Sequence, residues 1–257
     1  MSLQQNFAWR GLAAAAFAAV IAVAGPAVAG PDDLPGKVSA TATVTTDYYF
    51  RGINQSTDGS PSPAVQGSLD YALPIMGDSL AFRAGVWGSS VEFGDANLEM
   101  DFTGGFTGMV GDLTWDAGFI YYYYPGTASS NNFDYWEVAG KLSYAIGPVT
   151  PVIGINYSPD YFAASGDGWY LWGGADLAVN KLIGIERTVT LYARIGHQWI
   201  EKNANFGTPD YLDFKIAGVV EFFGFNLELA YVNTDIDDSV CPNLCGGTVV
   251  FTVSRTF

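Results

Sequence analysis

The sequence predicts an all-β protein, a twelve-stranded antiparallel transmembrane β-barrel with short periplasmic turns and longer outer loops. Residues 37–257 divide into twelve segments in which apolar and polar side chains alternate, as strands with two different faces require. Most segments have ten to thirteen residues. This length suits a tilted strand that crosses a bilayer with about 9 to 11 residues, whereas strands of soluble domains commonly have about 5 to 6. The last segment ends the chain on an aromatic residue, Phe257.

The twelve expected strands follow one another with connections of alternating length. They are residues 37–49, 64–73, 79–89, 96–107, 113–124, 134–144, 149–158, 168–179, 188–199, 210–222, 225–234 and 248–257. Long connections follow odd-numbered strands and tight ones follow most even-numbered strands, the asymmetry of transmembrane barrels with their periplasmic turns and outer loops. Two connections fit poorly, because 90–95 is short for an outer loop and 180–187 is long for a periplasmic turn.

The start of the chain has the composition of a targeting segment. Residues 1–29 combine Arg10, an apolar run over 12–24 and small residues at 27–29, which predicts a cleaved secretory signal peptide. The weakly charged start leaves an uncleaved anchor as the alternative, although the run is short for a spanning helix. Residues 30–36 are then a short periplasmic segment before the barrel.

The two faces of each strand differ in chemistry. In residues 113–124, Phe119 and Tyr123 share an apolar face, while Asp116 and Tyr122 share the other. A soluble sandwich would show the same period with its apolar faces in a core. The aromatic residues decide for the membrane, because they gather near the expected strand ends as two girdles: Tyr48, Tyr121, Tyr123, Trp136, Tyr157, Trp169 and Trp199 at the outer ends, and Tyr71, Trp115, Tyr144, Phe222 and Phe257 at the inner ends.

Composition narrows the possible partners. The chain has 26 acidic and 11 basic residues and a formal charge of −15, which excludes nucleic acid, because phosphate binding needs clustered Lys and Arg. An apolar outer wall predicts contact with outer-membrane lipid and lipopolysaccharide in the bacterial outer membrane. The closing strand with its terminal Phe257 is similar to the signal by which the barrel-assembly machinery recognises its clients.

No catalytic, cofactor or metal site is predicted. The single histidine, His197, faces lipid by the alternation, and no His-x-Ser arrangement of a membrane lipase or deacylase accompanies it. Cys241 and Cys245 lack the further ligands that zinc needs, so a disulfide formed in the oxidising periplasm is favoured over free thiols. The acidic stretch 235–238 beside them is read as a solvated loop rather than a Ca²⁺ site.

Charged residues that face the lumen by the alternation are the main candidate site. The acids are Asp70, Glu99, Asp101, Asp116, Glu137, Asp176, Asp213, Glu221 and Glu228, and the bases are Arg83, Lys141, Arg194 and Lys215. Opposed charges that pair would brace and plug the barrel, whereas an unpaired acidic surplus would make a cation-preferring constriction. We expect that constriction around Arg83, Glu99, Asp101 and Asp116, with Arg83 bracing Glu99 or Asp101.

Arg51 and Gln55 lie where the first expected strand meets its outer loop. That loop contains Pro61 and Pro63, which restrict its backbone. It either folds into the mouth of the barrel or forms an ordinary surface loop anchored by its own turns. The sequence favours neither.

Several stretches together resemble a known family. Residues 48–56 (YYFRGINQS), 63–71, 84–89, 116–126 and 249–257 are similar to the TorF-type porins of proteobacteria, a family also described under the label Gcw_chp as outer-membrane proteins of unknown function. Gly174-Ala175 and the Cys-Pro-Asn-Leu-Cys insertion depart from the pattern. The resemblance implies a barrel and a pore without an assigned substrate.

The expected function is an outer-membrane porin-like channel for passive diffusion of small polar solutes, with a preference for cations. The alternative is a non-conducting structural or surface-binding barrel whose lumen is plugged by paired charges.

Overall fold

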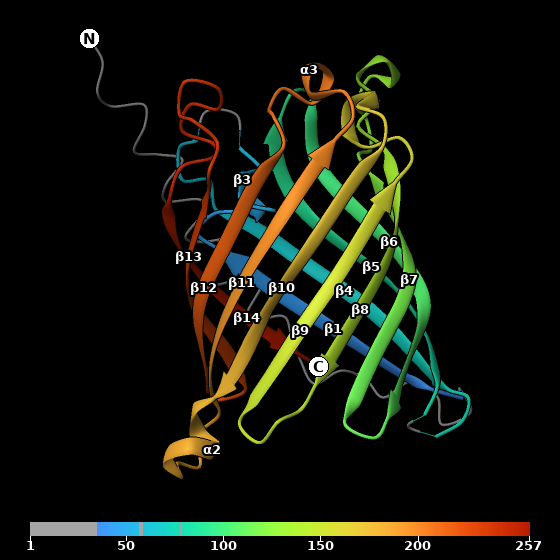
Figure 1. Cartoon of the computed structure of the whole chain (residues 1–257), viewed down its shortest axis with the longest axis vertical. Helices are drawn as coiled ribbons and strands as arrows, with labels where there is room; N and C mark the ends of the chain where they lie inside the picture. The colour runs from blue at the N-terminus through green and yellow to red at the C-terminus, as the bar shows by residue number, and fades with distance from the viewer. Residues whose placement is uncertain (1–34, 57–58, 78) are drawn as a thin grey trace.

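The computed structural model describes residues 35–56, 59–77 and 79–257 as a closed antiparallel barrel of twelve strands (Figure 1). The wall strands are β1 (Lys37–Thr45), β4 (Ala64–Pro74), β5 (Ala81–Phe93), β6 (Ala96–Val110), β7 (Leu113–Tyr123), β8 (Tyr135–Tyr144), β9 (Val149–Ser158), β10 (Gly168–Ala178), β11 (Val189–Ile200), β12 (Tyr211–Phe222), β13 (Phe225–Thr234) and β14 (Thr248–Thr256). Each pairs with its neighbours along the chain. The expected fold is confirmed, while the expected signal peptide lies outside the described residues.

The first and last strands close the ring. β1 pairs with β14 from Thr41↔Thr256 to Thr45↔Thr252. Phe257 extends this ladder, because its backbone N–H donates to the carbonyl of Ala40 at 2.8 Å. Closure leaves the wall without an unpaired strand edge, which a bilayer would not tolerate.

The connections make the two ends of the barrel unlike each other. One end, the loop end, has long connections that contain η1 (Ser129–Asn131), η2 (Phe162–Ala164) and α3 (Asn203–Phe206). The opposite end, the turn end, has tight connections apart from 179–188, which contains α2 (Val179–Ile183). Figure 1 shows α3 and α2 at opposite ends of the tilted strands. The loop end corresponds to the expected outer side, and α2 accounts for the long inner connection.

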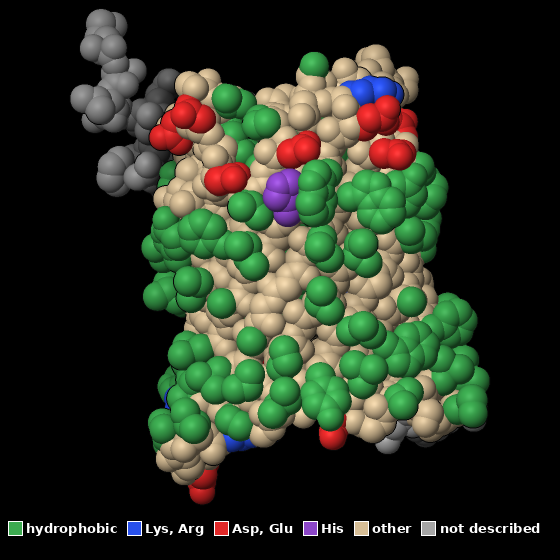
Figure 2. Space-filling model, viewed as in Figure 1, with side chains coloured by type: hydrophobic (Ala, Val, Ile, Leu, Met, Phe, Trp, Pro, Cys, Tyr) green, Lys and Arg blue, Asp and Glu red, His purple; other side chains and the backbone are tan. Residues whose placement is uncertain are grey.

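The outer wall is apolar. Leu69, Ile195, Ile216 and Leu229 are all more than half exposed there. Figure 2 shows hydrophobic side chains over this surface, with acidic side chains gathered towards the loop end. Within the described residues, no helix has both the length and the hydrophobicity needed to cross a membrane.

The first expected strand is too long, because the chain leaves the wall after Thr45. Residues 49–54 instead form a separate hairpin of β2 (Tyr49–Phe50) and β3 (Ile53–Asn54). Tyr48, expected in the outer girdle, faces the interior. Its ring lies 5.5 Å from that of Trp87, and its hydroxyl donates to Glu99 at 3.4 Å.

The third expected strand is too short. β5 extends to Phe93 and pairs with β6 as far as Phe93↔Ala96. The short outer connection is therefore a two-residue turn at Gly94-Asp95, and Gly94 has the positive φ of 55° that such a turn needs. Because β5 and β6 have 13 and 15 residues, the barrel wall extends further towards the loop end at these two strands.

Candidate functional site

The hairpin of residues 49–54, here called the first-loop hairpin, has a turn that fixes its shape. Tyr49 pairs with Asn54 and Phe50 with Ile53, so Arg51 and Gly52 form a two-residue turn. Their φ values of 46° and 79° are those of a type I′ turn, whose twist matches the flanking strands.

The tip of the hairpin presses against the barrel wall at Gly52. A Cβ at this position would lie 2.5 Å from Cγ2 of Thr234 and 2.9 Å from Cβ of Asp213. Only glycine therefore fits between the turn and β12 and β13. The contact places the hairpin inside the lumen, where the hairpin ends against the wall rather than in solvent.

The base of the hairpin is tied to its surroundings by an amide and a carboxylate. Asn54 donates from Nδ2 to Oδ2 of Asp47 at 2.8 Å and accepts from the N–H of Ser56 at 2.7 Å. Burial raises the pKa of Asp47 above its ordinary value, and its hydrogen bonds oppose this shift. The backbone N–H of Asn54 also donates to the carbonyl of Leu244 at 2.8 Å. The hairpin is thus attached to both the first and the last loop.

Arg51 holds the tip of the hairpin to the far wall. Its Nη2 donates to both carboxylate oxygens of Glu137, at 2.8 and 2.7 Å, and its Nη1 donates to Oε1 of Gln198 at 2.7 Å. Glu137 lies on β8 and Gln198 on β11, whereas the hairpin enters between β1 and β4. We call these three side chains the Arg51 latch. The latch spans the interior of the barrel.

The latch is buried and its hydrogen bonds are satisfied. The side chains of Arg51 and Glu137 are 7% and 1% exposed. Oε2 of Glu137 also accepts from the hydroxyl of Tyr122 at 3.1 Å and from Nδ2 of Asn156 at 2.9 Å. Hydrogen bonds between a charged guanidinium and a carboxylate that also accepts from further donors are among the stronger interactions available inside a protein.

Aromatic rings surround the guanidinium. Its carbon lies 4.2 Å from the ring centre of Tyr170 and 4.8 Å from that of Phe50, distances at which a cation is attracted to a ring face. Burial is the largest single effect and lowers the pKa of Arg51, but the carboxylate of Glu137 and the neighbouring tyrosines together raise this pKa by more, so the net shift is upward. The latch arginine is therefore charged at every physiological pH.

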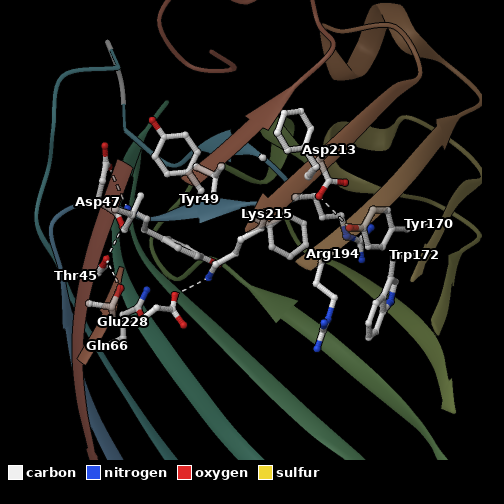
Figure 3. Close-up of a pocket in the computed structure, with 18 of the residues that line it drawn as sticks. Thr45, Asp47, Tyr49, Gln66, Tyr170, Trp172, Arg194, Asp213, Lys215 and Glu228 are labelled. Carbon is white, nitrogen blue, oxygen red and sulfur yellow. Dashed lines mark hydrogen bonds and ion pairs between the residues drawn. The ribbon is translucent and has the colours of Figure 1, made fainter. Parts of the chain in front are cut away.

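An inner cavity of about 610 Å³ lies below the hairpin, on its turn-end side. Figure 3 shows Lys215, Glu228, Arg194 and Trp172 around this space. Lys215 donates to Glu228 at 2.7 Å, and Arg194 is paired with Asp176. The inner cavity therefore has both aromatic residues and paired charges on its wall.

A second space, the outer pocket, lies above the hairpin on the loop-end side and has a volume of about 350 Å³. Phe50 lines both spaces, so the hairpin separates them. The outer pocket is lined by Phe50, Ile53, Asn54, Gln55, Ser56, Phe93, Tyr124, Tyr135, Tyr161, Phe162, Phe206, Gly207, Thr208, Tyr211, Val240, Cys241, Pro242 and Leu244.

The expected constriction is wrong, because the structure separates its four members. Arg83 donates from Nε to Oδ2 of Asp116 at 2.6 Å and pairs with neither Glu99 nor Asp101. Arg83 stands opposite Gly105 on β6. Asp101 on the same strand is four residues away, about 13 Å at the rise of a β-strand. The Arg83–Asp116 pair lies towards the turn end, and the two other acids lie at the level of the hairpin.

The remaining inward charges divide into paired and unpaired groups. Lys141 makes no ion pair with any described residue, although it stands opposite Asp116. Glu99, Asp101 and Asp213 each have a buried carboxylate oxygen without a hydrogen-bond partner in the described part of the chain. These three surround the hairpin, so an acidic surplus remains at the loop-end half of the lumen.

Several residues of the site were missing from the sequence-based expectation. Three of them carry no formal charge: Gln198 of the latch, Asn156 beside Glu137 and Tyr170 beside the guanidinium. The expectation was based on opposed charges and therefore did not include them. The alternation could have placed Gln198 in the lumen, because it assigns the adjacent His197 to the outer wall. His197 stacks there with Trp199, with 4.1 Å between ring centres.

Gln55 and the last loop complete the mouth. The carbonyl of Gln55 accepts from the N–H of Glu92 at 2.9 Å, so this residue anchors the hairpin to β5. Cys241 and Cys245 are joined by a disulfide. Asp237 accepts from the N–H of Ser239 at 2.8 Å, and hydrogen bonds from that residue lower the pKa of Asp237. The acidic stretch thus stabilises turns of its own loop.

Comparison with known proteins identifies a family and a fold. A profile of the bacterial family of unknown function Gcw_chp matches residues 29–257. No functionally curated protein matches the chain. The family match confirms the Gcw_chp resemblance, and the TorF-type label stays a prediction.

Solved structures with a similar fold are membrane barrels. The NanC porin has 8% identity and a TM-score of 0.51, with 86% of this chain and 98% of the porin covered. A chain solved in work on in-meso crystallization of membrane proteins has 6% identity and a TM-score of 0.50, with 85% and 83% covered. An outer membrane channel from Pseudomonas putida F1 has 14% identity and a TM-score of 0.49, with 90% and 100% covered. At identities this low the likeness concerns the fold alone.

Proposed function

The chain belongs to the Gcw_chp family of bacterial proteins of unknown function, and we propose that it is an outer-membrane channel for passive diffusion of small polar solutes, held closed by its own first-loop hairpin. Lipid and lipopolysaccharide surround its wall in this proposal. The terminal Phe257, paired with Ala40 where the ring closes, is then the residue that the barrel-assembly machinery recognises.

The inner cavity carries this proposal. A space of about 610 Å³ with charged side chains on its wall is large enough for small hydrated solutes, and a barrel that needed only bracing would fill it with side chains. The hairpin lies between this cavity and the loop end, and three hydrogen bonds from Arg51 hold its tip. Displacement of the hairpin would join the two spaces.

A preference for cations follows from the charges that stay unpaired. Arg83, Arg194 and Lys215 are each paired with an acid. The carboxylates of Glu99 and Asp213 have no basic partner among the described residues. They would line the path once the hairpin moved, and a narrow low-dielectric wall would focus their field on a passing ion.

A non-conducting barrel is the second candidate, and the burial of the Arg51 latch favours it. An ion pair that is 7% and 1% exposed, with its carboxylate satisfied by further donors, is the kind of contact that braces a plug. In this case the hairpin would stay docked permanently.

Conductance in planar bilayers distinguishes the two candidates. The purified protein, with folding checked by heat-modifiable migration on detergent gels, should give discrete current steps with a reversal potential that indicates cation preference. Silence from both the folded wild type and a folded variant without the latch would reject the channel. A preference for chloride would reject the role given to the unpaired carboxylates.

A further inference from the structure

We propose that the outer pocket is a binding site for a neutral, mostly apolar molecule built on flat fused rings. This inference goes beyond the proposed function, because binding at the loop end requires no passage through the barrel. The pocket is formed by residues of the first-loop hairpin, by the aromatic residues of three loops and by the loop that carries the disulfide.

The pocket selects against charge. None of its described lining residues is acidic or basic, whereas the inner cavity below the hairpin has six charged residues on its wall. An ion that entered the outer pocket would lose hydration and find no opposite charge, which costs several kcal/mol. Neutral molecules avoid this penalty.

Three of the polar side chains in the lining, those of Asn54, Gln55 and Thr208, already form hydrogen bonds with the protein. Asn54 uses both ends of its amide. Gln55 donates to the carbonyl of Ile53 at 2.9 Å, and Thr208 donates to the carbonyl of Pro209 at 3.1 Å. The pocket therefore presents mainly ring faces and hydrocarbon, and a ligand with few polar groups matches it.

The rings in the wall favour a flat ligand. The rings belong to Phe93 on β5, Tyr161 and Phe162 at the start of η2, and Phe206 at the end of α3. Phe162 contacts Phe93 and Phe206 edge to face, with 5.7 Å between the centres of Phe93 and Phe162. Tyr161 and Phe206 are stacked with 5.5 Å between their centres. Aromatic ligands gain energy from both arrangements.

The volume sets the size of the ligand. An engineered protein cavity of about 150 Å³ holds one benzene, so a pocket of about 350 Å³ accommodates two or three fused rings. Ligand pockets in proteins begin at about 300 Å³.

Simple packing of the loops does not explain the pocket. Protein interiors are close-packed, and an apolar void of this size forfeits dispersion contacts over its whole lining. The space persists over the docked hairpin, with Phe50 and Ile53 in its lining. A ligand of matching shape restores the missing contacts.

Three naphthalene derivatives of similar size test the charge and ring requirements. Titration calorimetry on the full chain in lipid nanodiscs should show saturable binding of neutral 2-naphthylmethanol, with empty nanodiscs as the partition control. Binding of 2-naphthoate and 2-naphthylmethylammonium should be more than about tenfold weaker, because either charge would be buried without a partner.

Two variants locate the binding. Phe206→Ala removes one ring and should weaken binding about 2- to 10-fold, the range expected for an aromatic contact. Val240→Trp, at a lining position that is 47% exposed, should fill the space and abolish binding without disturbing the barrel. Phe222→Ala at the turn end is the matched control and should bind as the wild type does.

Several results would overturn the assignment. They are the absence of saturable binding by the wild type, equal binding of the three compounds, and affinity that survives Val240→Trp. Failure of the channel proposal is separate, because calorimetry measures binding whether or not the barrel conducts. Binding without current would leave the pocket assigned and the channel rejected, and current without binding would do the reverse.

Discussion

Replacement of Arg51 by asparagine isolates the latch from the turn that presents it. Arg51 has a φ of 46°, and asparagine is well tolerated at positive φ and favoured in type I′ turns. Arg51→Asn therefore keeps the backbone of the hairpin and removes the guanidinium. Three hydrogen bonds to Glu137 and Gln198, at 2.7 to 2.8 Å, are lost, and Glu137 stays buried without its cation.

The size of the effect follows from this burial. Removal of one partner of a buried ion pair costs roughly 3 to 5 kcal/mol, and every 1.4 kcal/mol is a factor of ten in an equilibrium. The strands of the wall pair with one another independently of the latch, so most of the cost falls on docking of the hairpin. We expect the ratio of docked to displaced hairpin to fall by about 10² to 10³.

Single-channel recording in planar bilayers measures this ratio as the fraction of time spent open. Wild-type channels should be mostly closed with rare openings, and Arg51→Asn channels should be open for most of the recording. Arg83→Ala is the matched control, because it also removes an arginine–carboxylate pair from the lumen but does not touch the hairpin. An open fraction unchanged by Arg51→Asn, or raised equally by Arg83→Ala, would refute the latch.

Three further predictions use the same preparations. Gly52→Val should raise the open fraction as Arg51→Asn does, because its Cβ would lie 2.5 Å from Thr234; wild-type gating would contradict the docked hairpin. Arg83→Ala should shift the reversal potential towards the cation value by freeing the carboxylate of Asp116, and unchanged selectivity would place the selective region elsewhere. Neutral 2-naphthylmethanol should lower the open fraction, because the docked hairpin forms part of the outer pocket and ligand binding favours the state that contains it; an unchanged fraction at saturation would refute this coupling.

The inward or outward facing of side chains in the barrel wall could be predicted from the sequence, because it depends only on the two-residue period of a strand. Side chains alternate with a period of two, so a single apolar residue such as Phe119 assigns the facing of a whole strand. Phe119 is exposed on the outer wall, and Tyr122, three residues later and on the other face of the strand, is buried in the lumen. Strand limits differ where a connection is short, as at Gly94-Asp95.

The same alternation explains why the first-loop hairpin was not predicted from the sequence. Tyr48 and Phe50 continue the even-numbered apolar positions of the first strand, so the period alone gives no sign that the chain leaves the wall after Thr45. A local signal was nevertheless present. Arg51-Gly52 stands between Tyr49-Phe50 and Ile53-Asn54, and a glycine in a two-residue turn between two such short segments is a hairpin pattern.

The predicted constriction is wrong because alternation gives the face on which a residue lies and not its height along the barrel axis. Height depends on register, and β5 and β6 pair so that Trp87 stands opposite Asp101 and Arg83 opposite Gly105. Arg83 then reaches across to Asp116, where Gly118 leaves room for it: a Cβ there would lie 2.9 Å from Nη2. An irregularity between Ser90 and Phe93 shifts this register by one residue, so the short turn between the two strands would not by itself have predicted it.

The chemistry of the latch explains how one hairpin could serve as a closed gate. An isolated two-stranded hairpin is marginal in water, and arginine is a poor residue for a positive φ, so neither the turn nor the strands alone would hold residues 49–54 in the lumen. A buried ion pair is weak evidence for overall stability, but it defines one position well, since any other position leaves Glu137 without its cation. The base of the hairpin is held by Asn54 and by the packing of Phe50 and Ile53 against apolar clusters, whereas its tip is held by the directional bonds of Arg51, which can be released as a unit.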